Sequence, residues 1–262
     1  IEKIVGTLYF QVDPKDPRVV VVAHLDHGRC MLSLDTTGKS LHKRGYRESG
    51  HPAPLKETLA AAILQFAGYD GSQPFLDPMC GSGTIVIEAA EWALGLKPGR
   101  NRSFAFEHLA TFDAAAWSAM KAAAASPQPV PFIFSGSDRD AGAIDASRAN
   151  AARAGVGAVT SFSVRSVSDA TPPEGAPGLV IVNPPYGLRV GDKAPLRDLY
   201  ATFGKVMRTR FAGWRVGIFT ADAALARATG LPFTGKPLTV LHGGLRVSLW
   251  QTAPLQSPRS GA

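Results

Sequence analysis

The sequence contains few cysteines and no long apolar run, and these absences exclude several classes of protein. Its 262 residues include two cysteines, Cys30 and Cys80, which cannot form a disulfide framework and fit a reducing cytoplasm. No apolar segment reaches the roughly 20 residues of a transmembrane helix, and no signal peptide is visible at the start. No group of histidines and cysteines has metal-site spacing. We therefore expect a cytoplasmic protein with neither a membrane partner nor a metal.

Positive charge is concentrated in one short segment. The formal net charge of +7 favours a polyanionic partner. Residues 1–38 have a balance of −1, whereas residues 39–56 have a balance of +4, with Glu48 as their one acid. A basic segment of this kind can neutralise several phosphates of a nucleic acid, or it can be a solvated linker. We interpret residues 39–53 as a basic linker between two parts of the chain.

The chain before this linker has the pattern of short strands. Residues 4–12 and 19–34 are expected to be extended, because β-branched residues and period-two alternation are typical of strands. Residues 1–38 therefore form a short β-rich segment, too small for an independent sheet, which suggests that sequence precedes it. At the other end, the Ser-, Pro- and Gly-rich residues 254–262 are expected to be a disordered tail.

Residues 54–253 alternate between helices and strands, which predicts a parallel, doubly wound α/β sheet. The dipeptide Gly243-Gly244 indicates a closing hairpin that adds one antiparallel strand at the edge. This arrangement resembles the mostly parallel, Rossmann-like seven-stranded sheet of class I methyltransferases. The expected helices cover residues 54–68, 84–94, 113–125, 141–154 and 196–211, and the expected strands cover 74–77, 132–137, 159–164, 179–182, 215–220, 238–242 and 245–251.

The first motif is a strand that runs through a small-residue turn into a helix, over residues 76–84. In open α/β sheets, ligands bind at the carboxyl ends of strands, where glycines let the backbone approach closely. The turn is neither Gly-x-Gly-x-x-Gly nor a phosphate loop with Gly-Lys-Ser/Thr. It can bind a cofactor or merely pack a helix on a strand. The cofactor-binding candidates in this motif are Asp77, Pro78, Cys80, Gly81, Ser82, Gly83 and Thr84.

Two further motifs place carboxylates after later strands. Ser137 and Asp138 follow one strand, and Asp138 can accept hydrogen bonds from both hydroxyls of a ribose, while Asp140 is the expected cap of the next helix. Ser168 and Asp169 follow another strand, where a carboxylate can accept from the exocyclic amine of adenine. Both pairs can also be ordinary loop or cap residues. In this order, however, they predict a nucleoside-containing cofactor.

The fourth motif is the one with the most specific chemistry. A buried strand over residues 179–182 runs into Asn183, Pro184, Pro185 and Tyr186. An exocyclic base amine is a poor nucleophile, because its lone pair is delocalised into the ring. The amide oxygen of Asn183 and the carbonyl of Pro184 can each accept one of its hydrogens, and the prolines carry no N–H that would compete. Tyr186 can stack on the base. We therefore predict these four residues to be catalytic, through positioning and electrostatics.

With these motifs in place, residues 36–252 resemble the UPF0020 family of RNA methyltransferases, whose domain usually follows an RNA-binding THUMP domain. The resemblance implies S-adenosylmethionine (SAM) as cofactor, with S-adenosylhomocysteine (SAH) as its product. It implies that Asp77, Gly81, Gly83, Asp138 and Asp169 hold SAM. The bacterial branch resembles guanine-N2 methyltransferases of large-subunit ribosomal RNA, which makes that RNA the expected partner. The residues that carry the resemblance are Leu41–Arg47, Ala53–Glu57, Asp77–Thr84, Lys97–Trp117, Asn183–Gly187 and His242–Gly244.

Several alternatives share the Asn-Pro-Pro-Tyr loop. Adenine-N6 methyltransferases of DNA or RNA, transfer-RNA guanine-N2 methyltransferases and the glutamine-methylating enzymes of release factors are all compatible with it. A non-catalytic RNA-binding module with the same fold is a further alternative, although it would have no chemical need for Asn183, Asp138 and Asp77 together. The basic linker favours RNA. The candidate RNA contacts are Arg44, Arg47, Lys56 and Arg189.

Overall fold

The computed structural model describes residues 15, 17–47, 55–123, 127–186 and 193–257. Several expectations fall outside this part of the chain. They are the strand over residues 4–12, the end of the basic linker, the candidate RNA contact Arg189 and most of the C-terminal tail. Within the described part, no helix is long and apolar enough to span a bilayer.

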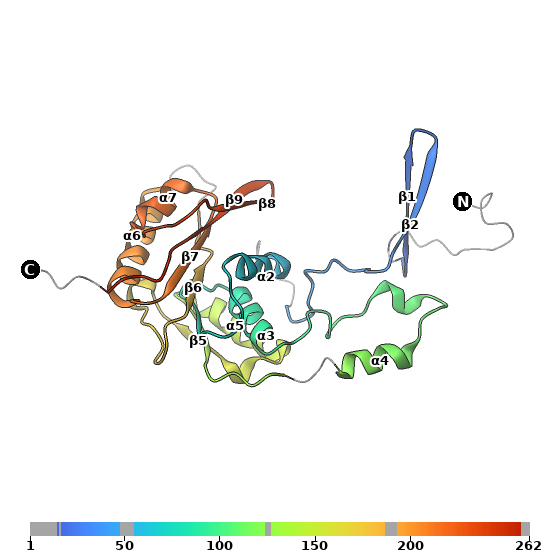
Figure 1. Ribbon diagram of the computed structural model, residues 1–262, viewed down its shortest axis with the longest axis horizontal. Coiled ribbons are helices and arrows are strands. Elements are labelled where there is room, and N and C mark those ends of the chain that lie inside the picture. The colour runs from blue at the N-terminus through green and yellow to red at the C-terminus, as the bar shows by residue number, and fades with distance from the viewer. Residues whose placement is uncertain (1–14, 16, 48–54, 124–126, 187–192, 258–262) are drawn as a thin grey trace, which may run out of the picture.

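A seven-stranded sheet forms the body of the molecule, in the order β5-β4-β3-β6-β7-β9-β8 (Figure 1). All neighbouring pairs from β5 to β7 are parallel, and β9 is antiparallel to both β7 and β8. The expected α/β fold class is therefore confirmed. The strands are β3 (Phe75–Asp77), β4 (Phe134–Asp138), β5 (Thr160–Val164), β6 (Leu179–Val182), β7 (Arg215–Thr220), β8 (Leu238–His242) and β9 (Leu245–Gln251).

The closing hairpin is present, but its reversed strand is not the outermost one. Gly243 and Gly244 both have positive φ, at 58° and 81°, as a tight two-residue turn requires. The turn brings β9 back between β7 and β8, so the edge strand β8 has the same direction as the parallel strands. The expected antiparallel hairpin at the edge of a mostly parallel sheet is confirmed, and its reversed strand β9 is the second strand from that edge.

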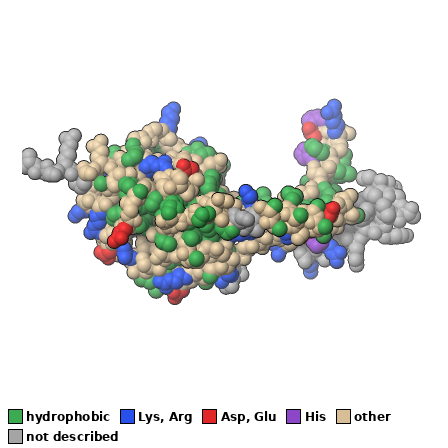
Figure 2. All heavy atoms as spheres, turned by 60° about the horizontal axis from the view of Figure 1, so that its bottom comes forward, with side chains coloured by type: hydrophobic (Ala, Val, Ile, Leu, Met, Phe, Trp, Pro, Cys, Tyr) green, Lys and Arg blue, Asp and Glu red, His purple; other side chains and the backbone are tan. Residues whose placement is uncertain are grey.

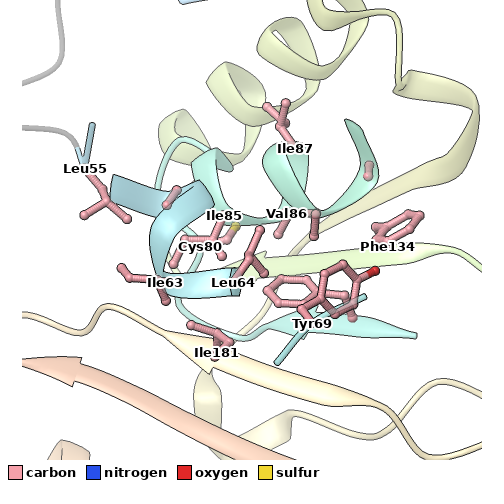
Figure 3. Close-up of a cluster of buried hydrophobic side chains, with 14 of the residues drawn as sticks. Leu55, Ile63, Leu64, Tyr69, Cys80, Ile85, Val86, Ile87, Phe134 and Ile181 are labelled. Carbon is pink, nitrogen blue, oxygen red and sulfur yellow. The ribbon is translucent and has the colours of Figure 1, made fainter. Parts of the chain in front are cut away.

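Helices cover both faces of the sheet and bury two apolar layers. On one face lie α2 (Glu57–Phe66), α3 (Thr84–Ala93) and α5 (Ala141–Ala154), and on the other α6 (Lys193–Arg210) and α7 (Ala223–Ala228) (Figure 1). Successive strand residues face opposite layers: Phe75 and Ile181 pack with the first set, Leu76 with the second. The close-up in Figure 3 shows Ile63, Leu64 and Ile85 meeting the sheet. Burial of both faces explains why β6 is entirely apolar.

A β-hairpin and an arm stand apart from this body (Figures 1 and 2). The hairpin pairs β1 (Val20–Asp26) with β2 (Arg29–Asp35), as the strand pattern over residues 19–34 predicts. The arm contains a 3-10 helix, η1 (Ala105–His108), and α4 (Ala114–Ala123). It is joined to the chain after β2 by a hydrogen bond from Phe106 N–H to Thr36 O, and by Arg102, whose guanidinium donates to carbonyls between residues 37 and 40.

Candidate active site

The strand order places the sequence motifs at one edge of the sheet. From β3 the chain moves outward through β4 to β5, then crosses back to β6 and continues to β7, so the order reverses between the neighbours β3 and β6. Ligands of doubly wound sheets bind at such a reversal, beyond the carboxyl ends of the strands. Asp77 ends β3, Asp138 ends β4, and Asn183 directly follows β6. The expected cofactor and catalytic residues therefore come together.

The glycine loop, which we define as residues 78–83, links β3 to α3. Gly81 and Gly83 have φ values of 51° and 81°, in the left-handed region that disfavours side chains. A Cβ on Gly81 would meet no atom within 4 Å, so this glycine faces open space. Gly83 is the N-cap of α3 and provides no side-chain cap, which leaves the first N–H groups of the helix available to an anion. Cys80 is buried, and burial raises the pKa of its thiol, so it is a packing residue.

Asp77 is a buried carboxyl group beside this loop. Its side chain is only 2% exposed, and Oδ1 accepts a hydrogen bond of 3.0 Å from Met79 N–H. The pKa of Asp77 is raised to about 8, chiefly by desolvation and to a smaller extent by the nearby Asp138 carboxylate, while the hydrogen bond from Met79 N–H opposes the shift. A carboxyl group held in this way stays protonated and neutral until a nearby cation stabilises its ionised form or the pH rises above its pKa. Such perturbed groups are concentrated at functional sites.

The titration of Asp77 predicts a pH dependence of stability. An exposed aspartate has a pKa near 4, so between about pH 4 and pH 8 the folded state retains a proton that the unfolded state has lost. The free energy of unfolding should therefore fall as the pH rises through this window. Asp77→Asn cannot ionise, and its amide oxygen can still accept from Met79, so it should lack this part of the fall. Urea unfolding at pH 5 and pH 9 measures the difference; an identical loss in both proteins would contradict the prediction.

Asp138 ties the glycine loop to the end of β4. Its Oδ2 accepts from Gly81 N–H at 3.0 Å, and its Oδ1 accepts from Asp140 N–H at 3.1 Å. Both oxygens are thus oriented by backbone donors, while a carboxylate retains further lone pairs for ligand hydroxyls. Asp140 accepts from Gly142 N–H and caps α5, which confirms its expected role as a cap. Ser137 is buried, and its carbonyl accepts from Cys80 N–H.

The third motif lies in the 3-10 turn η3 (Val167–Asp169), just beyond β5. Ser168 and Asp169 are both exposed. The segment is adjacent to Asp138, because Arg165 N–H donates to the Asp138 carbonyl at 2.8 Å. Arg210, at the end of α6, holds the turn in place by donating to the carbonyls of Ser168 and Ala170 at 2.9 and 3.1 Å.

Asn183 presents the most unusual polar atom of the site. Its Oδ1 is buried and has no hydrogen-bond partner among the residues that the structure describes. Leaving a buried acceptor without a partner costs about 1–3 kcal/mol, so such an atom requires an explanation. Pro184 is buried and Pro185 is exposed, and neither offers an N–H to this oxygen. Tyr186 is half-buried, and desolvation raises the pKa of its hydroxyl, so it is a neutral aromatic surface at neutral pH.

Sequence reasoning missed the residues that support the glycine loop from α5. Ser147 Oγ donates to Gly81 O at 2.7 Å, and Asn150 Nδ2 donates to Ser82 O at 3.0 Å. Both side chains are buried. Their spacing of three residues puts them on the same face of α5, which was the one available signal. A polar pair on an otherwise apolar helix face indicates a buried polar partner.

Two of the candidate RNA contacts are engaged inside the protein. Arg44 forms a salt bridge of 3.1 Å with Glu88, and the two side chains are 10% and 5% exposed. Arg47 lies 3.3 Å from Glu57, with side-chain exposures of 15% and 5%. Both guanidinium groups pair with buried carboxylates and so have a structural role, while their predicted contact with RNA stays a prediction. Lys56 remains exposed.

The fold and site together define a class I methyltransferase. The chain belongs to the UPF0020 family, described as the RMKL-like methyltransferase domain, whose family model matches residues 44–239. This confirms the resemblance that the motifs indicate, and with it a family of SAM-dependent methyltransferases. In the described residues, no group of three or more His, Cys, Asp or Glu side chains could hold a metal ion.

Curated relatives cover most of this chain but are longer than it. The slr0064 protein of Synechocystis sp., provisionally named an RNA methyltransferase, is 39% identical over 91% of this chain and 62% of its own length. The ribosomal RNA large subunit methyltransferase K/L of Chromohalobacter salexigens is 41% identical over 84% of this chain and 32% of its own length. The chain therefore spans less than two thirds of these relatives.

Solved structures share the fold over nearly the whole chain. SMU.472, provisionally named a methyltransferase and solved in complex with SAH, is 32% identical, with a TM-score of 0.80 over 92% of this chain and 62% of its own. A predicted N6-adenine-specific DNA methylase from Listeria monocytogenes is 33% identical, with a TM-score of 0.79 over 91% of this chain and 60% of its own.

Proposed function

We propose that this chain transfers a methyl group from SAM to an exocyclic amine of an RNA base, and that the base is a guanine, methylated at N2, in large-subunit ribosomal RNA. The observation that carries the proposal is the buried, unpartnered Oδ1 of Asn183 at the switch point of the sheet. Among the described residues, Asn183 Oδ1 has no hydrogen-bond donor, and the exocyclic amine of the proposed substrate base can be that donor.

The catalytic residues act on the acceptor base. Asn183 Oδ1 accepts one hydrogen bond from the base amine, and the carbonyl of Pro184 accepts the other. With both hydrogens held, the nitrogen lone pair is turned out of the ring plane toward the methyl donor. Tyr186 packs on the face of the base, which has to leave its helix or be unpaired. The methylated amine would then lose one of its two protons to solvent, so the rate enhancement comes from orientation and preorganised acceptors rather than from a titrating base.

The residues around the glycine loop fit the parts of SAM. SAM supplies an electrophilic methyl group on its sulfonium when it is bound. The free N–H groups at the start of α3 suit its carboxylate, and the buried Asp77 suits its ammonium group. Asp138, already oriented by two backbone donors, accepts from the ribose hydroxyls, and Asp169 accepts from the adenine amine. The open space at Gly81 allows close approach of the ligand.

The choice of RNA over DNA is supported by the family and by the names of the relatives. The K/L relative is named for large-subunit ribosomal RNA and the Synechocystis relative for RNA. Ribosomal RNA would place the activity in the cytoplasm. Lys56, which is exposed, and Arg189, which lies outside the described residues, remain our proposed RNA contacts.

An adenine-N6 activity is the second candidate function, because the structure from Listeria monocytogenes is named for that activity. Methylation of a guanine in transfer RNA is the third candidate.

Methyl transfer from labelled SAM tests the proposal directly. The chain is incubated with unmodified ribosomal RNA, transfer RNA and DNA, and each product is digested to nucleosides. We expect label in N2-methylguanosine from large-subunit ribosomal RNA. Label in N6-methyladenine, or in transfer RNA alone, would show that the proposed target is wrong and that the protein is still a methyltransferase. A folded chain that binds no SAM in calorimetry would contradict the enzyme itself and favour a non-catalytic RNA-binding module.

A further inference from the structure

The basic linker makes a direct contact with the helix that follows the glycine loop. Arg47 Nη2 donates to Thr84 Oγ1 at 2.5 Å and to Leu55 O at 3.2 Å. Its Nε lies 3.3 Å from Glu57 Oε1, as an ion pair without an aligned hydrogen bond. Thr84 is the first residue of α3 and is 5% exposed. One guanidinium therefore joins the linker, the start of α2 and the start of α3.

A second chain of hydrogen bonds reaches the same loop through α5. Arg153 Nε donates to the carbonyl of Tyr46 at 2.6 Å, and Arg153 Nη2 donates to Asn150 Oδ1 at 2.7 Å. Asn150 Nδ2 in turn donates to Ser82 O at 3.0 Å. Two consecutive linker residues, Tyr46 and Arg47, are thus connected to both ends of the Ser82–Thr84 segment.

Arg44 can be compared with Arg47 to separate the contribution of the ion pair from that of the hydrogen bond to Thr84. It too is a linker arginine with a buried glutamate partner, Glu88, but among the described residues none of its hydrogen bonds reaches the glycine loop. A buried ion pair contributes little net stability over an apolar pair, because desolvation offsets the Coulomb attraction. The hydrogen bond from Arg47 to Thr84 has an effect beyond that of the ion pair. It orients the first turn of α3, where the backbone N–H groups have no intrahelical partners.

We propose that Arg47 is a positioning residue for SAM, which holds the glycine loop and the start of α3 in the conformation that binds the cofactor. The proposal rests on the proposed function of residues 77–84 as the SAM site. The linker is then a part of the cofactor site as well as a connection. Lysine cannot replace Arg47 in this role, because a single ammonium group lacks the planar fork that reaches Glu57 and Thr84 together.

The matched variants Arg47→Lys and Arg44→Lys test the proposal in the full chain. Both keep the positive charge beside the buried glutamate, so both should fold, as circular dichroism and thermal unfolding can verify. We expect Arg47→Lys to raise the Kd of SAM about tenfold in calorimetry, and Arg44→Lys to leave it unchanged. At saturating SAM, the kcat of Arg47→Lys should remain within about twofold of wild type, since Arg47 does not contact the reacting atoms.

A second variant approaches the same loop from α5. In Asn150→Asp the carboxylate can still accept from Arg153 but can no longer donate to Ser82 O, so SAM binding should also weaken. The inference is overturned if Arg47→Lys and Arg44→Lys lower the melting temperature alike and bind SAM with the wild-type Kd. If the proposed SAM site itself were wrong, Asp138→Asn would also bind SAM with the wild-type Kd, and this result distinguishes the two failures.

Discussion

Replacing Asn183 by alanine is expected to reduce methyl transfer to RNA about 1000-fold while SAM binding remains nearly unchanged. The substitution removes the amide oxygen that we propose accepts from the base amine. An interaction made only as the transition state forms is lost from kcat rather than from ligand affinity. Within the described part of the chain that oxygen has no partner, so its removal also relieves a buried unsatisfied group. Single-turnover transfer from labelled SAM and calorimetry of SAM measure the two effects separately.

Asn183→Asp is the matched control for this prediction. Its carboxylate retains acceptor oxygens at the same position but adds a buried charge, which is costly without a partner. We expect its rate to lie between those of the wild type and Asn183→Ala. If Asn183→Ala retained full activity with unchanged SAM binding, the catalytic assignment of the loop would be wrong, whatever the fate of the cofactor site.

Asp138→Asn is expected to raise the Kd of SAM about 100-fold, the second of the large effects. Both carboxylate oxygens of Asp138 accept from backbone N–H groups, those of Gly81 and Asp140. An amide has only one oxygen, so its NH₂ group must face one of these donors, and it can no longer accept from both ribose hydroxyls. Each lost hydrogen bond to a charged acceptor weakens binding by about 1.5–3 kcal/mol. Calorimetry with SAM and SAH measures the loss.

The neighbouring Asp140→Asn separates this effect from a general disturbance of the segment. Asp140 accepts from Gly142 through Oδ1 alone and caps α5, and asparagine is an equally good N-cap. Its SAM affinity and thermal stability should therefore match the wild type. If the variants at 138 and 140 changed SAM binding to the same extent, ribose recognition by Asp138 would be contradicted.

The order of strands and helices was predictable from the sequence to within a few residues. The strand β6 is a continuous apolar run between Gly178 and Asn183, which made it recognisable. The helix α5 was predicted with its observed bounds because Asp140 caps it and Gly155 ends it. The helix α7 was not predicted. It has six residues, too short for a recognisable period, and its start depends on Asp222, whose carboxylate accepts from Ala224 and Leu225 N–H.

The basic linker shows where reasoning from charge was insufficient. A local excess of Lys and Arg predicted contacts with phosphate, yet Arg44 and Arg47 are paired with Glu88 and Glu57. The acids of these pairs lie 44 and 10 residues further along the chain, on α3 and α2. The net charge of a short segment does not include the acidic residues outside it that pair with its cations in the folded protein.

The sequence by itself determined which chemical groups form the candidate site of this protein. Each motif is local: a strand end, a turn of small residues or prolines, and one polar side chain at a set offset, so composition and spacing identify it. Only the tertiary structure decided how those groups are engaged. The reversal of strand order between β3 and β6 brings Asp138 and Asn183 to one edge, and long-range contacts connect Arg47 to Thr84 while leaving Asn183 Oδ1 unpartnered. These outcomes depend on packing and desolvation between distant segments, which no local pattern encodes.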